Sequence, residues 1–431
     1  MDYIILQKAK KHSFLIWDIG YGAEHAKRLG ADGNKVYYFN EWMEGLPKFN
    51  RYSVGIGLPG VTKLPDLDDL NDNFFAHIDD ADCIAFIFLG RGDLADWLRK
   101  QGYTVYGAGR GERLETDRIY AKEIQKKIGL PIQKYEVFDD IDKVLEYLKK
   151  SKSKKMVKIN IFRGDLETLK AVDHDAASLV LTPFKALLGP FSNHFQFLVE
   201  DMIQDVVAEA GFDLFFNGKN FLKPYLWGYL VGRYYVGKYT DTLPKPLDLI
   251  ATKMTPVLRD LDYRGALSME AIFTKDGTPY VIDWTCRMPY PLSYIYTNSI
   301  RNYGDVIYGC ASGDDVEIDI NGEYVGYVQL LTSPTTPIKS WVKVKFPKNI
   351  GENIKLKQPS KVGGAFYTIP GEELEVAVPV TVANSAKNVL TKLEDLSGQI
   401  QTVTIDAEEI LGAKTKVLEA IKSGNSVGLK F

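Results

Sequence analysis

In the first part of the chain, segments with the apolar pattern of strands alternate with segments that have the amphipathic pattern of helices. Apolar, strand-like runs cover residues 13–19, 35–39 and 83–89, and helical patterns follow the first and third of them over 23–29 and 93–100. Strands that alternate with amphipathic helices are typical of a parallel α/β sheet. We therefore predict a Rossmann-like domain over residues 1–112.

The later parts of the chain carry other patterns. A helix is predicted from the capping residue Asp117 onwards, ending where Gly129 and Pro131 provide stop signals. From about residue 320, short β-runs surround one helical pattern near 385–396, which indicates a separate, small β-rich α+β domain. The predicted class is therefore a multidomain protein that combines α/β and α+β units.

Composition and charge narrow the kind of protein. The 53 Lys and Arg residues nearly balance the 56 Asp and Glu residues, so the chain lacks the broad positive field that favours nucleic acid. The apolar runs fall far short of the ~18 residues that span a bilayer, and the first residues lack the layout of a secretory signal. Three widely spaced cysteines suit a reducing compartment. We expect a cytoplasmic enzyme with small-molecule partners, no membrane and an open oligomeric state.

The most informative stretch is a predicted β-hairpin. Asp276 and Gly277 separate two apolar runs, which is a strong signal for a two-residue hairpin loop. This loop would pair Glu270 directly with Asp283, with their Cβ atoms ~4.5–5.5 Å apart. The hairpin therefore predicts two facing carboxylates.

Thr285 and Arg287 follow Asp283 at two-residue intervals, so strand alternation predicts all three on one face. Facing carboxylates repel each other by a few tenths to ~1 kcal/mol. Mg²⁺ would compensate, because carboxylates and substrate phosphates are its usual ligands, and Arg287 would add positive charge for a phosphoryl group. The alternative, about equally supported by spacing alone, is a solvent-exposed face on which Arg287 neutralises one carboxylate.

This arrangement resembles the ATP-grasp ligases, in which a glutamate on one core strand and an acidic residue, an asparagine and an arginine on the next bind Mg²⁺ and the phosphates of ATP. The resemblance implies that Glu270 and Asp283 bind Mg²⁺ or Mn²⁺ and that Thr285 replaces the asparagine as a further metal ligand. It also implies that Arg287 steadies an acyl phosphate. Glu270 and Arg287 would then be the catalytic residues.

The resemblance extends towards the N-terminus and narrows to the phosphoribosylamine-glycine ligases. The run over 114–122, with Arg118 at the position of a lysine, is similar to a segment of those enzymes. Val157 and Lys158 resemble the strand whose lysine contacts the phosphates of ATP. The run of Val199, Glu200 and Asp201 resembles the hinge along adenine.

Glu209 matches the acidic residue that holds the ribose hydroxyls in this family. The opening Gly20-Tyr21-Gly22 is similar to the first glycine loop of the phosphoribosylamine-glycine ligases. The resemblance implies a Rossmann-like pre-ATP-grasp domain over 1–112, an ATP-grasp lid over 113–195, an ATP-grasp core with the metal site over 196–320, and a β-rich α+β C-terminal domain over 321–431.

One segment departs from the family. After Lys158 the superfamily commonly has a glycine-rich loop over the triphosphate, whereas this chain keeps only Gly164 there. Arg163 would bind phosphate by direct charge in place of backbone amides. This departure is similar to the divergent ligase-like proteins of bacteriophage genomes.

The resemblance implies an ADP-forming carboxylate-amine ligase that works through an acyl phosphate, with ATP and Mg²⁺ as cofactors. Two alternatives stay open: an ATP-binding scaffold of the same fold, and an NAD(P)-dependent oxidoreductase suggested by Gly20 and Gly22. Lys238, in an aromatic-rich strand, is a further candidate for phosphate or carboxylate contact. His25 and His194 are candidate general bases, although single histidines are more often structural.

Overall fold

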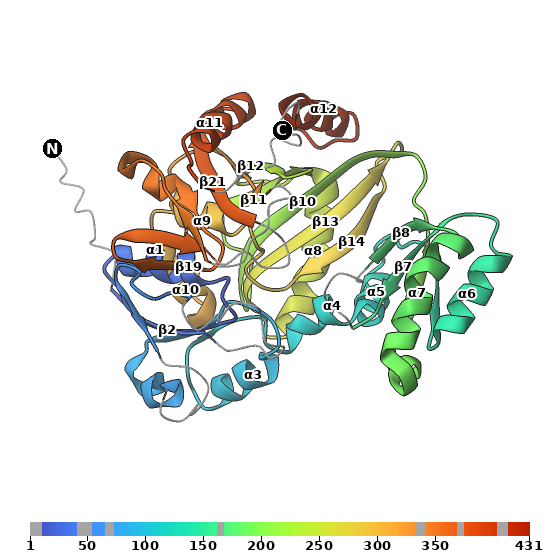
Figure 1. Cartoon of the computed structure of the whole chain (residues 1–431), viewed down its shortest axis with the longest axis horizontal. Helices are drawn as coiled ribbons and strands as arrows, with labels where there is room; N and C mark the ends of the chain where they lie inside the picture. The colour runs from blue at the N-terminus through green and yellow to red at the C-terminus, as the bar shows by residue number, and fades with distance from the viewer. Residues whose placement is uncertain are drawn as a thin grey trace.

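The computed structural model of the chain describes residues 11–40, 54–64, 73–161, 168–332, 341–368, 375–402 and 413–431 (Figure 1). Within these ranges the strands form four sheets, of five, nine, four and three strands. No helix in the same ranges is long and apolar enough to cross a membrane. The predicted combination of α/β and α+β units is confirmed.

The N-terminal domain holds a parallel sheet in the order β3-β2-β1-β4-β5. Its elements are β1 (Ser13–Asp18), α1 (Ala23–Ala31), β2 (Lys35–Asn40), β3 (Val61–Lys63), η3 (Phe75–Asp80), β4 (Cys83–Phe86), α3 (Gly92–Lys100), β5 (Val105–Tyr106) and η4 (Gly109–Glu112). The strand order reverses between β1 and β4, as in doubly wound sheets. The predicted Rossmann-like entry domain is confirmed.

A small antiparallel sheet, in the order β6-β9-β7-β8, follows along the chain. Its elements are α4 (Arg113–Thr116), α5 (Arg118–Lys127), β6 (Tyr135–Phe138), α6 (Ile141–Lys150), β7 (Lys155–Ile159), β8 (Thr168–Val172), α7 (His174–Leu188), η5 (Gly189–His194) and β9 (Phe197–Asp201). Asp117 caps α5 by accepting from the Tyr120 N–H at 3.0 Å, as the sequence predicts. The sheet includes β9 and so continues beyond the predicted boundary at residue 195.

The large sheet runs in the order β14-β13-β10-β11-β12-β15-β21-β16, with β18 beside β21. Its strands and nearby helices are β10 (Val206–Asn217), β11 (Tyr225–Val231), β12 (Tyr234–Thr240), α8 (Lys245–Asp260), β13 (Arg264–Thr274), β14 (Pro279–Thr285), α9 (Tyr294–Ser299), α10 (Tyr303–Ser312), β15 (Tyr324–Val328), β16 (Leu330–Leu331), β18 (Ile354–Lys355) and β21 (Glu375–Ala383). Because β12 pairs with β15 and β15 with β21, the sheet crosses the predicted boundary at residue 320. The C-terminal region is therefore continuous with this sheet rather than separate from it.

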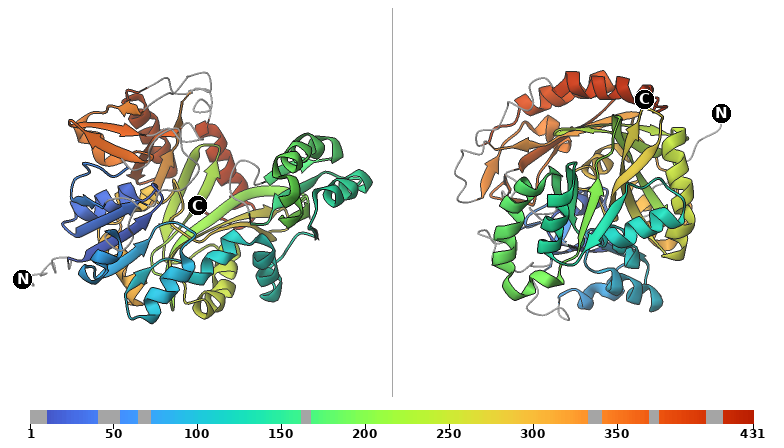
Figure 2. Two further views of the ribbon diagram at one scale, coloured as in Figure 1. Left: turned by 60° about the horizontal axis from the view of Figure 1, so that its bottom comes forward. Right: turned by 90° about the vertical axis from the view of Figure 1, so that its right-hand side faces the viewer.

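The remaining C-terminal elements surround that end of the large sheet. They are β17 (Val342–Val344), η6 (Lys348–Asn353), β19 (Pro359–Val362), β20 (Ala365–Thr368), α11 (Ala386–Gly398) and α12 (Ala413–Asn425). Figures 1 and 2 show the four-stranded sheet, with α6 and α7, projecting at the opposite end of the molecule from the N-terminal domain. The large sheet lies between these two units.

The two faces of the large sheet differ. Phe212 and Leu214 of β10 pack in one apolar core with the helix α8. Phe215 of β10 and Tyr235 of β12 belong to another core, which they share with β1, β4, α9 and α10. Since side chains alternate along a strand, β10 presents its odd-numbered residues to the N-terminal domain, and that face carries the candidate site.

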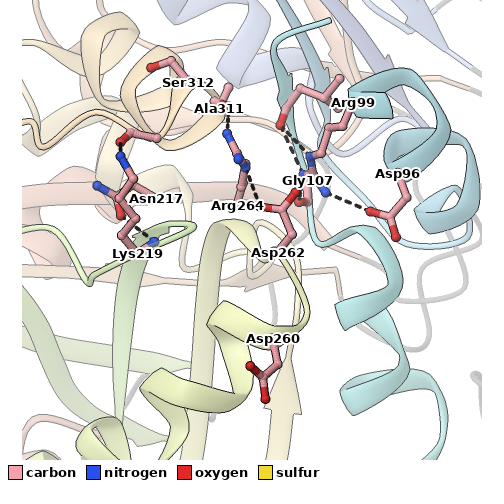
Figure 3. Close-up of polar contacts among 12 residues, drawn as sticks. Asp96, Arg99, Gly107, Asn217, Lys219, Asp260, Asp262, Arg264, Ala311 and Ser312 are labelled. Atoms are coloured by element: carbon pink, nitrogen blue, oxygen red, sulfur yellow. Dashed lines mark hydrogen bonds and ion pairs between the residues drawn. The ribbon is translucent and has the colours of Figure 1, made fainter. Parts of the chain in front are cut away.

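Polar contacts tie the start of β13 to the N-terminal domain (Figure 3). The Gly107 N–H donates to the Arg264 carbonyl at 2.6 Å, and the Arg99 guanidinium donates to the Gly107 carbonyl at 2.6 Å. The Arg264 guanidinium donates in turn to the Ala311 carbonyl near the end of α10 at 2.8 Å. The strand that carries Glu270 is thus fixed at its first residue.

Candidate active site

Glu270 on β13 is the register partner of Asp283 on β14, as the sequence predicts. The predicted two-residue loop is wrong. The Thr274 N–H donates to the Thr278 carbonyl at 3.2 Å, so three residues, 275–277, form the loop. Gly277 takes a φ of +81° there, which is the left-handed residue that a three-residue hairpin loop requires.

A β-bulge at Ile282 restores the predicted pair. The register shifts between the pair Glu270–Asp283 and the pair Ala271–Val281, which leaves Ile282 as the extra residue of β14. Ile282 and Asp283 both line the same cavity as a result. The bulge therefore aims two consecutive side chains of β14 into the candidate site.

The environment of Glu270 disfavours its negative charge. Burial raises the pKa of Glu270 from 4.5 to about 7, with further contributions from the carboxylates of Asp283, Glu209 and Asp213 and an opposing one from Lys170. A charge that is removed from water and faces other carboxylates favours the protonated form. The site therefore gains stability from any cation that enters it.

The donor set fits a hard divalent cation. Glu270 and Asp283 offer carboxylate oxygens, and Thr285, the register partner of Ser268, is two residues along the same strand as Asp283. Mg²⁺ is usually held by one or two carboxylates together with substrate phosphates. Among the described residues, no three acidic, histidine or cysteine side chains are grouped closely enough to hold a metal by themselves, so phosphate oxygens or waters would complete the coordination.

A cavity of about 570 Å³ lies beside this pair, between the small sheet and the large sheet. Seven residues predicted from the sequence line it: Arg118, Lys158, Glu200, Asp201, Glu209, Glu270 and Asp283. The small sheet and the helix α5 contribute Lys158, Arg118, Glu200 and Asp201 to the wall, and the large sheet contributes Glu209, Glu270 and Asp283. This distribution of charge suits a polyphosphate with a bound cation.

Lys158 is held by acceptors on two sides. Its Nζ forms an ion pair with Glu200 at 2.9 Å and donates to the carbonyl of the bulge residue Ile282 at 3.4 Å. Glu200 is buried and also forms an ion pair with Lys122 at 2.7 Å. The two lysines hold the pKa of Glu200 below its usual value, although burial opposes them. A buried carboxylate that keeps its charge fixes both lysines at the cavity wall.

Arg118 also lines the cavity, at the start of α5. Its guanidinium donates to the Ile159 carbonyl at the end of β7, at 2.6 Å. The Asn160 side chain accepts from the Ile119 N–H at 2.8 Å and donates to Asp117 at 3.1 Å. The first turn of α5 is therefore bound to the end of β7, which positions Arg118 beside the strand of Lys158.

Arg287 differs from its predicted position. The strand β14 ends at Thr285, so Arg287 lies beyond the strand whose alternation placed it beside Asp283. Its Nε donates to the buried carboxylate of Glu115 at 3.1 Å, and its guanidinium lies over the Phe88 ring at 4.5 Å. The other oxygen of Glu115 accepts from the Cys286 N–H at 2.6 Å. Glu115, which the sequence analysis assigned no role, thus fixes the chain direction after β14.

Besides Arg287, three predicted site residues in the described ranges do not line the cavity. Val199 has a buried side chain in the apolar core of the small sheet, so only its backbone could lie along a ligand. Thr285 is on the strand but outside the cavity wall. Lys238, on β12, forms an ion pair with Glu323 at 3.2 Å and lies over the Tyr324 ring. Arg163 lies outside the described residues.

Residues that the sequence analysis missed also line the cavity. Lys170 and Thr168 extend from β8, where Thr168 is the register partner of Lys158. The alternation of Thr168 and Lys170 around the apolar Leu169 is the signal that would have identified them. Gln133, which accepts from Lys122 at 2.7 Å, comes from a loop with no such periodicity.

The first glycine loop does not offer its amides to a dinucleotide. The N–H groups of Gly20 and Gly22 both donate to Oδ2 of Asp18 at 2.7 Å, and the Tyr38 hydroxyl donates to the same oxygen at 2.6 Å. A dinucleotide pyrophosphate needs such amides at the helix N-terminus. The carboxylate of Asp18 occupies that position, which argues against the oxidoreductase alternative.

His25 of the same loop region is structural. Its ring nitrogens lie 2.6 Å from the Tyr303 hydroxyl and 3.1 Å from the Ser293 hydroxyl, and the side chain is buried. Burial lowers the pKa of His25 to about 3, with a smaller contribution from Lys355. The neutral imidazole contacts both hydroxyls and so joins α1 to α10 and to the residue that precedes α9. His194 ends η5 of the small sheet and does not line the cavity.

Comparison with solved structures shows which known folds this architecture resembles. The phosphoribosylamine-glycine ligase of Thermotoga maritima matches with a TM-score of 0.65 and 17% identity over 91% of this chain and 98% of that one. A biotin carboxylase from Campylobacter jejuni, in an ATP complex, matches with a TM-score of 0.67 and 13% identity over 98% of both chains. The chain has the ATP-grasp fold.

A third ATP-grasp structure is the biotin carboxylase domain of the Hydrogenobacter thermophilus 2-oxoglutarate carboxylase, bound to MgADP and bicarbonate. It matches with a TM-score of 0.68 and 13% identity over 97% of this chain and 99% of that one. No model of a known protein family matches the sequence. The predicted ATP-grasp fold is therefore confirmed, at 13–17% sequence identity to these three structures.

Proposed function

We propose that the protein is an ADP-forming ligase that joins a carboxylate to an amine through an acyl phosphate. The observation that supports this function best is the cavity in which Lys158 and Arg118 lie across from the facing pair of Glu270 and Asp283. Phosphoryl transfer needs positive charge around the phosphates and acidic ligands for a divalent metal. An ATP-grasp fold with an acidic pair and opposed cations provides both. The fold also occurs in the ligase and carboxylases named above.

The cations and the acidic pair have separate tasks in this proposal. Lys158 and Arg118 bind the phosphates of ATP, and the hinge at Glu200 and Asp201 lies along the adenine. Glu270 and Asp283, with Thr285 as a weaker oxygen donor, are the residues that would hold Mg²⁺. When bound, Mg²⁺ neutralises charge on the transferring phosphoryl group.

The reaction then needs positioning rather than a protein nucleophile. An oxygen of the substrate carboxylate attacks the γ-phosphorus, the bond to the bridging oxygen breaks, and ADP leaves. The nitrogen of the amine attacks the acyl carbon, the C–O bond breaks, and inorganic phosphate leaves with the electron pair and one proton of the amine. Arg287, held by Glu115, supplies fixed positive charge at this stage.

Release of ADP across a panel of amino acids tests the proposal, with and without added primary amines. The expected result is release that requires both an acid and an amine. Tight binding of Mg-ATP in calorimetry without such release would support the scaffold alternative instead. Failure to bind Mg-ATP would overturn both.

A further inference from the structure

Two aromatic rings stack at the point where the strand order of the N-terminal sheet reverses. Tyr21 follows β1 and Phe88 follows β4, the two strands between which the order changes direction. Their ring centroids are 5.4 Å apart with the planes at 20°, and both residues are half-buried. Ligands of open α/β sheets usually bind outside the carboxyl ends of the strands at such a point. Because Asp18 accepts from the amides of the glycine loop there, side chains rather than amides are left to contact a ligand.

Tyr290 extends this pair to a row of three rings. Its ring centroid is 4.7 Å from that of Tyr21. Its hydroxyl donates to one oxygen of the buried Glu375, whose other oxygen accepts from Gln329 at 2.7 Å. Tyr290 is itself half-buried. We call Phe88, Tyr21 and Tyr290 the aromatic row; it is held by buried partners and is still partly exposed.

The aromatic row begins at Arg287. The guanidinium carbon lies 4.5 Å from the centroid of the Phe88 ring, and the Met288 N–H donates to the Ile87 carbonyl at 3.3 Å. Glu115 holds the same guanidinium at 3.1 Å, and the Arg287 side chain keeps 19% of its surface exposed. In the proposed function Arg287 acts on the acyl phosphate. The rest of the acid would then extend from Arg287 along the aromatic row.

Open space adjoins this end of the row. A Cβ at Gly90, two residues after Phe88, would meet no atom of the described residues within 4 Å. A Cβ at Gly22, one residue after Tyr21, would instead lie 3.0 Å from the carboxyl carbon of Asp18. The chain is therefore open at the Phe88 loop and closed at the glycine loop.

The charges along the aromatic row favour an anionic ligand. Lys357 is 3% exposed, and its Nζ lies 5.8 Å from the centroid of the Tyr21 ring and 5.7 Å from that of the Tyr290 ring. Together with Arg287, it places cations near both ends of the row. A ligand ammonium that used these rings would be repelled by both cations, whereas a carboxylate would be attracted to Arg287.

Building on the proposed function, we infer that the acid substrate is an aromatic carboxylic acid. Its ring packs on Phe88, Tyr21 and Tyr290, and its carboxylate faces Arg287 and the γ-phosphate of ATP. Contact between aromatic rings adds to the burial of apolar area, by an amount that corresponds to about three- to tenfold in affinity. The aromatic row therefore distinguishes an aromatic ring from an aliphatic ring of similar size.

Phenylacetate and cyclohexylacetate test the inference, because their rings are similar in size and only the first is aromatic. Each acid is supplied with Mg-ATP and hydroxylamine, a small amine that converts an acyl phosphate to a hydroxamate, and both ADP and hydroxamate are measured. The variants are Phe88→Leu and Tyr21→Leu, which keep an apolar side chain and remove a ring. Phe366→Leu is the matched control, because Phe366 is also half-buried, stacks on Phe346 with the centroids 5.6 Å apart, and has Lys361 over its ring.

We expect wild type and Phe366→Leu to use phenylacetate about three- to tenfold more efficiently than cyclohexylacetate, as measured by kcat/KM. In Phe88→Leu and Tyr21→Leu this ratio should fall below about twofold, through a higher KM for phenylacetate. Their affinity for Mg-ATP in calorimetry should stay at the wild-type value, which shows that the variants are folded. Equal use of the two acids by wild type, an unchanged ratio in both row variants, or turnover of acetate alone would each overturn the inference.

The two proposals fail in different ways. Calorimetric titration of both acids with a non-hydrolysable Mg-ATP analogue measures the aromatic row without turnover. If neither ADP nor hydroxamate forms, but phenylacetate binds more tightly than cyclohexylacetate and loses this advantage in Phe88→Leu, the ligase function is wrong and the row still binds an aromatic acid. If hydroxamate forms but wild type does not distinguish the two acids, the ligase function stands and only the assignment of the aromatic row fails.

Discussion

Glu270 and Asp283 face each other across β13 and β14 because a one-residue bulge at Ile282 offsets a three-residue loop. The bulge also turns the Ile282 carbonyl towards Lys158, at 3.4 Å. One local irregularity therefore pairs the two carboxylates and links them to the opposite wall of the cavity. The predictions below test the consequences of this arrangement.

The first prediction concerns stability without metal. The pKa of Glu270 is raised from 4.5 to about 7, so its contribution to stability is present below pH 4.5 and is lost as the pH rises through 7. Between pH 5 and pH 8 the free energy of unfolding of wild type should fall by about 1–3 kcal/mol more than that of Glu270→Gln. Urea denaturation measures the difference, and Mg²⁺ should reduce it at pH 8 in wild type alone. Identical pH dependence in both proteins would contradict the assignment.

The second prediction compares two lysines. Lys158→Met should weaken Mg-ATP binding by about tenfold or more, because a cation at the phosphate wall is lost, while Glu200 keeps its ion pair with Lys122. Lys238→Met is the control, since Lys238 pairs with Glu323 outside the cavity. Calorimetric titration of both variants with Mg-ATP provides the measurement. A larger loss in the Lys238 variant would reverse our placement of the two side chains.

The third prediction concerns Glu115 as a positioning residue. Glu115→Gln keeps an acceptor for the Cys286 N–H but removes the charge that holds Arg287. We expect kcat to fall by about tenfold with less than a twofold change in the KM for ATP, since Arg287 acts on the acyl phosphate in our proposal. The rate should fall further in Arg287→Ala and change little more in the double variant. Additive losses in the double variant would show that the two residues act independently.

The sequence predicted the Rossmann-like order, the helix cap at Asp117 and the pairing of Glu270 with Asp283, because each depends on local periodicity or turn chemistry. It did not predict the bulge at Ile282, since an extra strand residue leaves no signal in the alternation of so short a run. It also missed the exit of the chain after Thr285, which depends on the buried Glu115 from a distant helix.

The surroundings of Lys238 are a further feature that the sequence did not predict. Its aromatic neighbours and positive charge resemble a ligand contact in sequence, but strand pairing brings β15 and Glu323 beside it. The continuation of the large sheet past residue 320 is likewise a matter of long-range pairing. Contacts between segments far apart in the chain thus decided where the predictions failed.

The fourth prediction concerns the glycine loop. Because the carboxylate of Asp18 already accepts from Gly20 and Gly22, the protein should show no saturable binding of NADH or NADPH by fluorescence titration. Asp18→Asn should lower the free energy of unfolding by roughly 1–3 kcal/mol, because the Tyr38 hydroxyl and two amides lose a charged acceptor. Saturable nicotinamide binding by wild type would restore the oxidoreductase alternative.

The most direct test of the central claim follows the oxygen atoms of the carboxylate. With an acid from the ADP-release panel labelled with ¹⁸O, an acyl-phosphate reaction transfers one labelled oxygen to inorganic phosphate for each amide formed. We predict this transfer in wild type, together with loss of both ADP and labelled phosphate in Glu270→Gln. Phosphate that forms without label, or full turnover by the Glu270 variant, would contradict the ligase mechanism and its proposed metal pair.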